Sequence, residues 1–129
     1  MTIADWCILV AALLPLMVLA PAKLLGRSDY DNAEPRAASF YGEGFRARAW
    51  GAHVNGFEAF PFFAAAVLLA EIRQTPQSTI DALALAYVAL RIVYVAAYLG
   101  GRPALRSAVW AFGLLVNIAI MVLPSFPLR

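Results

Sequence analysis

Charged residues are scarce in this chain, and their scarcity decides its class. Only 14% of the 129 residues are Asp, Glu, Lys or Arg, whereas 63% are hydrophobic. Soluble domains carry about 25% charged residues, so the composition excludes an ordinary soluble domain and indicates a membrane protein in contact with lipids. The chain also has no basic run and no basic helix face outside its loops, so we expect no nucleic-acid partner.

Cysteine and histidine are nearly absent as well. Cys7 is the single cysteine and His53 the single histidine. One cysteine cannot form an internal disulfide, and no basic residue near it in sequence favours a reactive thiolate. His53 has no second histidine, cysteine or acid at ligand spacing, so we expect no metal site. We interpret His53 instead as a hydrogen-bonded packing residue.

Four long apolar stretches dominate the rest of the chain, at Trp6–Ala22, Ala49–Ala70, Ala82–Leu99 and Ser107–Leu128. A helix needs about 20 such residues to cross a bilayer. Backbone groups in lipid must bond within their own segment, which excludes open sheets, and no alternating pattern indicates a barrel. We therefore predict one domain over residues 1–129, an all-α integral membrane four-helix bundle, with helices at about 3–25, 46–73, 79–99 and 104–123.

The basic residues predict the orientation of the helices. Seven of them lie in the first and third connections, namely Lys23, Arg27, Arg36, Arg46, Arg48, Arg102 and Arg106. Arg73 in the second connection and the C-terminal Arg129 are the two at the other end. Because basic loops stay in the cytoplasm, we expect both termini on the non-cytoplasmic side. The first stretch lacks the basic segment that opens a signal peptide, so we expect it to be retained.

Polar side chains share one face on each of the two middle helices. Helical spacing places Arg48, Asn55 and Glu58 together on the second helix. The same spacing places Arg91, Tyr94 and Tyr98 together on the third. At 1.5 Å per residue, Glu58 lies about 15 Å from Arg48 and Arg91 about 12 Å from Leu99. The acid and the guanidinium are therefore predicted at the same depth in the membrane.

Two interpretations of this match stay open. Glu58 and Arg91 can form an ion pair that only fixes the helix register, because an unpaired charge in a membrane is costly. Alternatively, the surplus of donors and cations around the pair binds an anionic ligand that enters from the cytoplasm. A third class, a small transporter or proton-coupled subunit, would need an inverted repeat or a chain of acids, and the sequence shows neither. Asn117 on the fourth helix is predicted to form an inter-helix hydrogen bond.

The stretch from Arg46 to Phe63, RARAWGAHVNGFEAFPFF, resembles the signature of the MAPEG family, the membrane-associated proteins in eicosanoid and glutathione metabolism. Its Asn55-x-x-Glu58-x-x-Pro61 core follows a basic helix start. The Arg91-x-x-Tyr94-x-x-x-Tyr98 pattern resembles the family too, and the likeness covers nearly the whole chain. A bacterial-type member is implied, which places the protein in a bacterial inner membrane.

The resemblance implies a homotrimer that binds glutathione as co-substrate at cytoplasm-facing subunit interfaces. By position, the ligand-binding residues would be Arg48, Asn55, Glu58, Arg91, Tyr94, Tyr98 and Arg102, with Arg106 as the catalytic, thiolate-stabilising arginine. The implied function is that of a glutathione-dependent transferase or peroxidase that conjugates or reduces lipophilic electrophiles.

One departure keeps an alternative open. Glutathione-using members carry an arginine four residues before the motif asparagine, whereas this chain has Gly51. A carboxylate contact is then lost, or Arg48 one turn earlier replaces it. The alternative is a non-catalytic protein on the MAPEG scaffold, whose polar pocket is structural or binds another anion.

Overall fold

The computed structural model describes residues 1–125, and all of the regular structure within that range is helical. Its elements are α1 (Ile3–Leu25), α2 (Ala38–Tyr41), α3 (Gly44–Ile72), α4 (Gln77–Leu99), α5 (Pro103–Val122) and the short 3-10 helix η1 (Leu123–Ser125). Within this range α1, α3, α4 and α5 are long and apolar enough to cross a membrane. The end of the predicted last stretch at Leu128, the domain limit at 129 and the basic Arg129 lie outside the described residues.

The observed bounds of the four long helices differ from the expected ones by two residues at most. α3 begins at Gly44 rather than at residue 46, and α4 begins at Gln77 rather than at residue 79. Pro76 immediately precedes α4, where its fixed φ and missing N–H are tolerated. α1 continues through Pro15 and Pro21, and α3 continues through Pro61.

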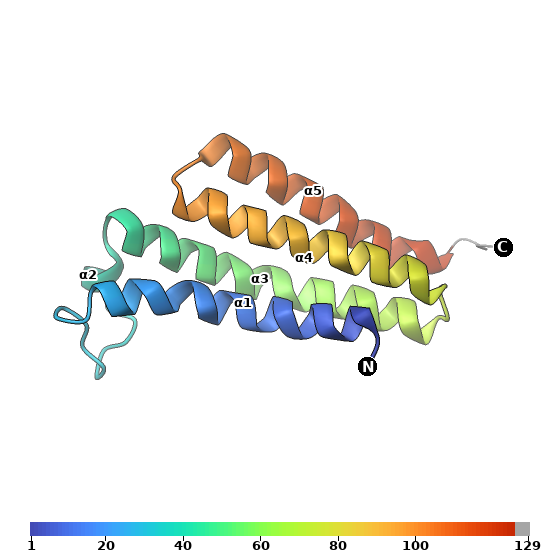
Figure 1. Cartoon of the computed structure of the whole chain (residues 1–129), viewed down its shortest axis with the longest axis horizontal. Helices are drawn as coiled ribbons and strands as arrows, with labels where there is room; N and C mark the ends of the chain where they lie inside the picture. The colour runs from blue at the N-terminus through green and yellow to red at the C-terminus, as the bar shows by residue number, and fades with distance from the viewer. Residues whose placement is uncertain (126–129) are drawn as a thin grey trace.

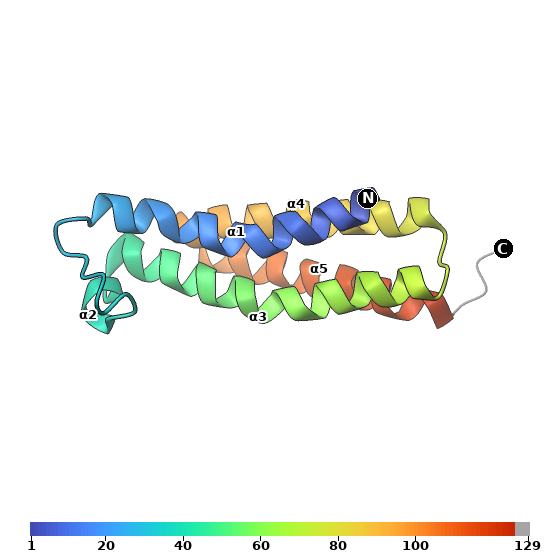
Figure 2. The ribbon, with the colours of Figure 1, turned by 90° about the horizontal axis from the view of Figure 1, so that it is seen from below.

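The four long helices run up and down beside one another (Figures 1 and 2). α3 and α4 lie at the centre of the arrangement, because each of them packs against both α1 and α5. The two connections α1–α3 and α4–α5 lie at one end of the bundle, and the α3–α4 turn lies at the other, near the N-terminus and the end of α5 (Figure 1). This topology brings the predicted basic connections to a common end.

The core between α1, α3 and α4 consists largely of small residues around one aromatic pair. Phe63 of α3 stacks on Tyr87 of α4 with ring centroids 4.1 Å apart. The buried residues around the pair are Ala4, Cys7, Ala11, Ala66, Val67, Ala70, Ile80, Ala84 and Ile120. Small side chains let helix backbones approach closely, which is how helices associate in lipid. Large apolar side chains such as Leu16, Leu85 and Leu115 point outward, where lipid tails would contact them.

The N-terminus is anchored by polar contacts. Thr2 and Asp5 form a capping box at the start of α1. Thr2 also donates from its hydroxyl to Glu71 of α3, and Asp81 of α4 accepts from the N–H of Ala4 at 2.9 Å. α1 is therefore fixed to both central helices at this end.

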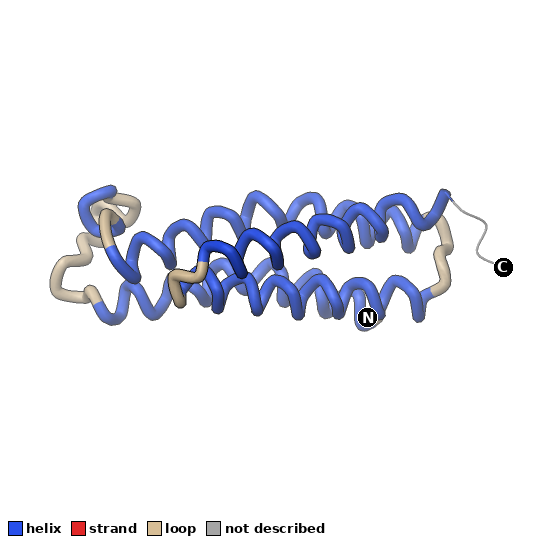
Figure 3. Tube along the Cα trace, turned by 90° about the horizontal axis from the view of Figure 1, so that it is seen from above, coloured by secondary structure: helices blue, strands red, loops and turns tan. Residues whose placement is uncertain are grey.

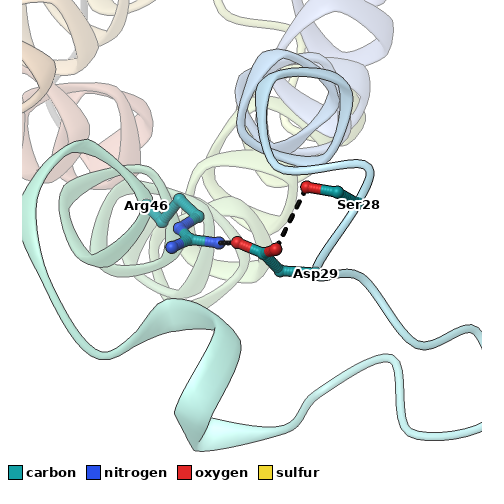
Figure 4. Close-up of polar contacts among 3 residues, drawn as sticks. All are labelled: Ser28, Asp29 and Arg46. Atoms are coloured by element: carbon teal, nitrogen blue, oxygen red, sulfur yellow. Dashed lines mark hydrogen bonds and ion pairs between the residues drawn. The ribbon is translucent and has the colours of Figure 1, made fainter.

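The connection between α1 and α3 was predicted as one polar loop, but it contains the short helix α2 (Figure 3). Asp29 accepts hydrogen bonds from Arg46 of α3 at 3.2 Å and from Ser28 at 3.0 Å (Figure 4). Tyr41 of α2 stacks on Trp50 with ring centroids 4.6 Å apart. Burial raises the pKa of the Tyr41 phenol above its usual range, so it stays uncharged in this packing. These contacts attach the connection to the first turns of α3.

Candidate functional site

Three adjoining hollows lie between α3, α4 and α5. The inner cavity, about 230 Å³, is lined by Asn55, Glu58, Ala59, Phe62, Tyr87, Arg91, Tyr94, Val109, Trp110, Gly113, Leu114 and Asn117. The open groove, about 730 Å³, is lined by Trp50, Gly51, Val54, Asn55, Glu58, Tyr94, Tyr98, Arg106, Ser107, Trp110 and Ala111. The mouth cleft, about 120 Å³, is lined by Arg48, Ala97, Tyr98, Gly101, Arg102, Pro103 and Arg106.

Shared residues join these hollows into one path. Asn55, Glu58, Tyr94 and Trp110 line both the inner cavity and the open groove. Tyr98 and Arg106 line both the open groove and the mouth cleft. All eight residues singled out from the sequence therefore lie along this path, although they come from three helices and the α4–α5 connection.

Arg91 is the anchored centre of the path. Its side chain is 7% exposed, and both Nη atoms donate to Oδ1 of Asn55 at 3.1 Å. The guanidinium also lies over the ring of Tyr94, 4.4 Å from its centroid. A buried charge needs such partners, since burying it without hydrogen bonds is costly. Asn55 and Arg91 therefore hold α3 and α4 in register.

The predicted ion pair between Glu58 and Arg91 is not formed. Within residues 1–125 the one ion pair joins Arg46 to Asp29, outside the apolar spans. Arg91 points instead to Asn55, which lies one turn closer to the start of α3 than Glu58. Glu58 lines the same cavity as Arg91 but is exposed toward the open groove. Its carboxylate is consequently available to a ligand.

Two arginines flank a pair of tyrosine rings along the path. Tyr94 and Tyr98 meet edge to face at 5.7 Å, and Arg106 lies over the ring of Tyr98 at 4.6 Å. Together with the contact between Arg91 and Tyr94, this makes a column in the order Arg91, Tyr94, Tyr98, Arg106. A cation–π contact is worth about 0.5–1 kcal/mol at an exposed site and about 2 kcal/mol between buried groups such as Arg91 and Tyr94. The column holds Arg106 in the open groove and Arg91 in the inner cavity.

Arg48 is not placed beside Asn55 and Glu58. Its Nε donates to the carbonyl of Leu99 at 2.9 Å, which satisfies one of the orphan acceptors at the end of α4. The next turn passes through Gly101, whose φ of 64° is in the left-handed region that favours glycine. Arg48 therefore lies in the mouth cleft with Arg102 and Arg106, and lines neither the open groove nor the inner cavity.

Gly51 has a packing role that the sequence did not reveal. A Cβ atom built at this position would collide with the hydroxyl and the adjoining ring carbon of Tyr98. Tyr98 therefore crosses from α4 onto the bare backbone of α3, at the place where glutathione-using relatives were expected to carry an arginine. The groove is also lined by Trp50, Trp110 and Ser107, which were not predicted as site residues. The two tryptophans were interpreted as interfacial residues, because tryptophans near span ends normally lie at the membrane interface.

Two further polar residues have different outcomes. Nδ1 of His53 lies 2.8 Å from the carbonyl oxygen of Pro15, so it carries the proton and donates. This confirms His53 as a hydrogen-bonded packing residue. Asn117 was expected to form an inter-helix hydrogen bond, but its Oδ1 is buried without a hydrogen-bond partner in the part of the chain that is described.

Comparison with known families gives one match. The model of the MAPEG family matches residues 3–126, nearly the whole chain. The chain belongs to the MAPEG family. Comparison with curated proteins and comparison with solved structures each give no match. Membership of MAPEG, together with the four apolar helices, makes this chain an integral membrane protein.

Proposed function

We propose that this MAPEG protein binds glutathione along the open groove and the mouth cleft, and that it activates the glutathione thiol for attack on a lipophilic electrophile. The observation that carries the proposal is the continuous path on which the eight predicted residues meet. The groove volume of about 730 Å³ lies within the ~300–1,000 Å³ usual for small-molecule sites. The groove also opens at the end of the bundle that carries the basic connections.

Each charge on the path suits one part of the tripeptide. Glu58, which has no ion-pair partner among residues 1–125, would bind the amino group. Arg48 and Arg102, which line the mouth cleft, would bind the carboxylates of glutathione. Tyr94 and Tyr98 supply hydroxyl groups along the groove, and the Arg91–Asn55 pair orients the asparagine.

Arg106 is the proposed catalytic residue. A free thiol has a pKa of about 8.5, and a nearby guanidinium lowers it by stabilising the thiolate. Arg106 cannot act as a base, since it is permanently charged. The thiol proton would leave to solvent, and the sulfur would then form a bond to the electrophilic carbon while the leaving group departs with its electron pair. In the reduction of a lipid hydroperoxide, the same thiolate would attack the terminal peroxide oxygen, so that the O–O bond breaks and the lipid alcohol leaves after taking up a proton. A second glutathione would then convert the resulting sulfenic acid to glutathione disulfide and water.

The open side of the groove supports a proposed homotrimer. Glu58 is exposed, and Trp110 is 45% exposed. A neighbouring subunit packed on this side would enclose the ligand. Mass spectrometry of the protein released intact from detergent tests the stoichiometry, and a monomer alone would contradict the proposal. Labelling of single cysteines in spheroplasts tests the proposed cytoplasmic side of the groove.

Isothermal titration of the purified protein with glutathione tests the binding. We expect heat from the wild type, and at least tenfold weaker binding from Arg91→Ala and Glu58→Gln. Arg73→Ala is the matched control, because it removes an exposed cation at the other end of α3. Absence of heat from the wild type would overturn the proposal.

The ultraviolet absorbance of the thiolate, followed against pH, tests the role of Arg106. The lowered pKa of bound glutathione should return toward about 8.5 in Arg106→Ala. In Arg106→Ala, the thiolate fraction at neutral pH should fall, and the rate of reaction with a halo-aromatic electrophile should fall in proportion. An unchanged titration curve would exclude Arg106 as the stabilising group.

One observation favours a second candidate, a non-catalytic anion-binding protein on the same scaffold. Tyr98 lies against Gly51, so the groove lacks the guanidinium of the arginine expected at that position. Binding of glutathione without turnover of any electrophile would support this candidate.

A further inference from the structure

We propose that the inner cavity is a binding site for an uncharged ligand, an apolar ring that carries one hydroxyl group, and that Asn117 recognises that hydroxyl. The proposal rests on the proposed function only for the ligand's role as a partner of bound glutathione. The binding itself depends on the cavity alone.

The size and lining of the cavity set the apolar part of the ligand. Its volume is about 230 Å³. A dry apolar cavity of about 150 Å³ can bind benzene, so this one has room for a ring with a short substituent. The walls are mostly apolar, with Phe62, Val109 and Leu114 among the lining residues.

Asn117 supplies the polar element. The residue is 3% exposed and lines the cavity, and its Oδ1 has no hydrogen-bond partner in residues 1–125. An unsatisfied buried acceptor costs about 1–3 kcal/mol. A carboxamide offers both an acceptor and two donors, and a hydroxyl likewise donates and accepts. A ligand hydroxyl therefore matches either end of the amide, and its binding removes this cost.

Gly113 shows that the hollow extends to the backbone of α5. Gly113 is four residues before Asn117, so both face the same side of the helix. It is a buried position, yet a Cβ atom built there would meet nothing within 4 Å. The space beside Asn117 is therefore open enough to receive a ligand atom.

The charges near the cavity favour a neutral ligand. The guanidinium of Arg91 already donates to Asn55 through both Nη atoms. Glu58, whose charge is opposite to that of Arg91, lines the same cavity, so the two charges offset each other for a ligand bound there. The ligand can enter through the open groove, because the groove and the cavity share Tyr94 and Trp110. It would then lie beside the proposed glutathione.

Quenching of tryptophan fluorescence by two brominated probes tests the proposal in the whole protein in detergent. The probes are 4-bromophenol at neutral pH and its near-isostere 4-bromotoluene. Trp110 lines the cavity, and a Trp6→Phe, Trp50→Phe background leaves it as the single tryptophan. We expect saturable binding of both probes with a roughly five- to tenfold preference for the phenol, the effect of one hydrogen bond.

Three variants locate the preference. Asn117→Leu should bind the two probes equally, and Asn117→Ala repeats this test if the leucine variant fails to fold. Gly113→Leu fills the cavity and should lose both probes. Leu115→Ala, at a lipid-facing position of the same helix, should change neither affinity.

Equal affinity of both probes in the wild type would overturn the proposal, as would a phenol preference that survives Asn117→Leu. Binding that persists in Gly113→Leu would place the probes elsewhere and also overturn it. If neither probe binds, the partner of Asn117 is an ordered water, and this result contradicts the proposed ligand site. The glutathione titration is separate: its failure with intact phenol binding removes the proposed function and leaves the cavity site standing.

Discussion

The two sides of the central helices α3 and α4 are built in opposite ways. Toward α1 they present small residues, and the space left there, between Ala11, Pro15, Ala52 and Gly56, is only about 10 Å³. Toward α5 they present Asn55, Arg91 and Tyr94 and leave the inner cavity of about 230 Å³. Helices in lipid associate through close packing rather than a hydrophobic drive. The contrast teaches that the α1 side holds the bundle together, so that the α5 side can remain hollow and polar.

Removal of Phe63, the largest fully buried side chain, should damage the packed side most. Phe63→Ala is expected to destabilise the protein by about 3 kcal/mol or more, since Phe→Ala in a core typically costs about 3–5 kcal/mol. The substitution removes the stack of Phe63 on Tyr87 and the contacts of the Phe63 ring with the surrounding alanines. Reversible unfolding in mixed micelles measures the effect, and Leu68→Ala on the lipid-facing surface is the control. A smaller loss of stability in Phe63→Ala than in Leu68→Ala would contradict the tight packing of the α1 side.

On the hollow side, the hydrogen bonds between Asn55 and Arg91 join α3 to α4, whereas apolar contacts join the helices on the packed side. Asn55→Ala leaves both Nη donors of Arg91 without their acceptor. Hydrogen bonds to charged groups contribute about 1.5–3 kcal/mol, so we expect a stability loss of that size. Asn55→Asp should restore the contact, and the same unfolding measurement compares the two. Full stability of Asn55→Ala would show that water replaces the amide.

Two glycines give the most direct comparison of the sides. A Cβ atom at Gly56 would press on the ring of Pro15, whereas one at Gly113 would meet nothing within 4 Å. Gly56→Ala overpacks the α1 side and should cost about 1–3 kcal/mol. His53 should then lose its contact with the Pro15 carbonyl, visible as a shifted imidazole resonance in NMR. An unchanged resonance and unchanged stability would contradict tight packing here.

The smallest expected effect has the opposite sign. Gly113→Ala places a methyl group in open space and removes the backbone entropy of a helical glycine, so we expect a gain of about 0.5–1 kcal/mol. The unfolding measurement used for Gly56→Ala applies, which makes the two variants a matched pair. A loss of stability at Gly113 would mean that the cavity closes in the membrane.

The sequence predicted the bundle well because its signals are local. Length and hydropathy placed the four long helices, and helical spacing placed Arg91, Tyr94 and Tyr98 on one face. The short α2 was missed, because four residues carry no detectable period and its stability comes from the contact of Tyr41 with Trp50.

The details of the site depend on side-chain direction, which spacing does not give. Glu58 and Arg91 were predicted at equal depth, and both do line the inner cavity. Their direct pairing was wrong, because Arg91 points to Asn55. Arg48 was expected to share a face with Glu58, but a backbone carbonyl at the end of α4 was its partner, and no sequence pattern identifies such an acceptor. The unpartnered amide of Asn117 was likewise hidden, since its partners depend on how α5 packs.

The collision of Tyr98 with any side chain at position 51 has an evolutionary consequence. A mutation that introduces arginine there must displace the phenol, whose hydroxyl is the far end of a side chain that can rotate. The two positions are therefore coupled, because the direction that the side chain of residue 98 takes depends on the size of residue 51. The effect of a substitution at either position should then depend on which residue stands at the other.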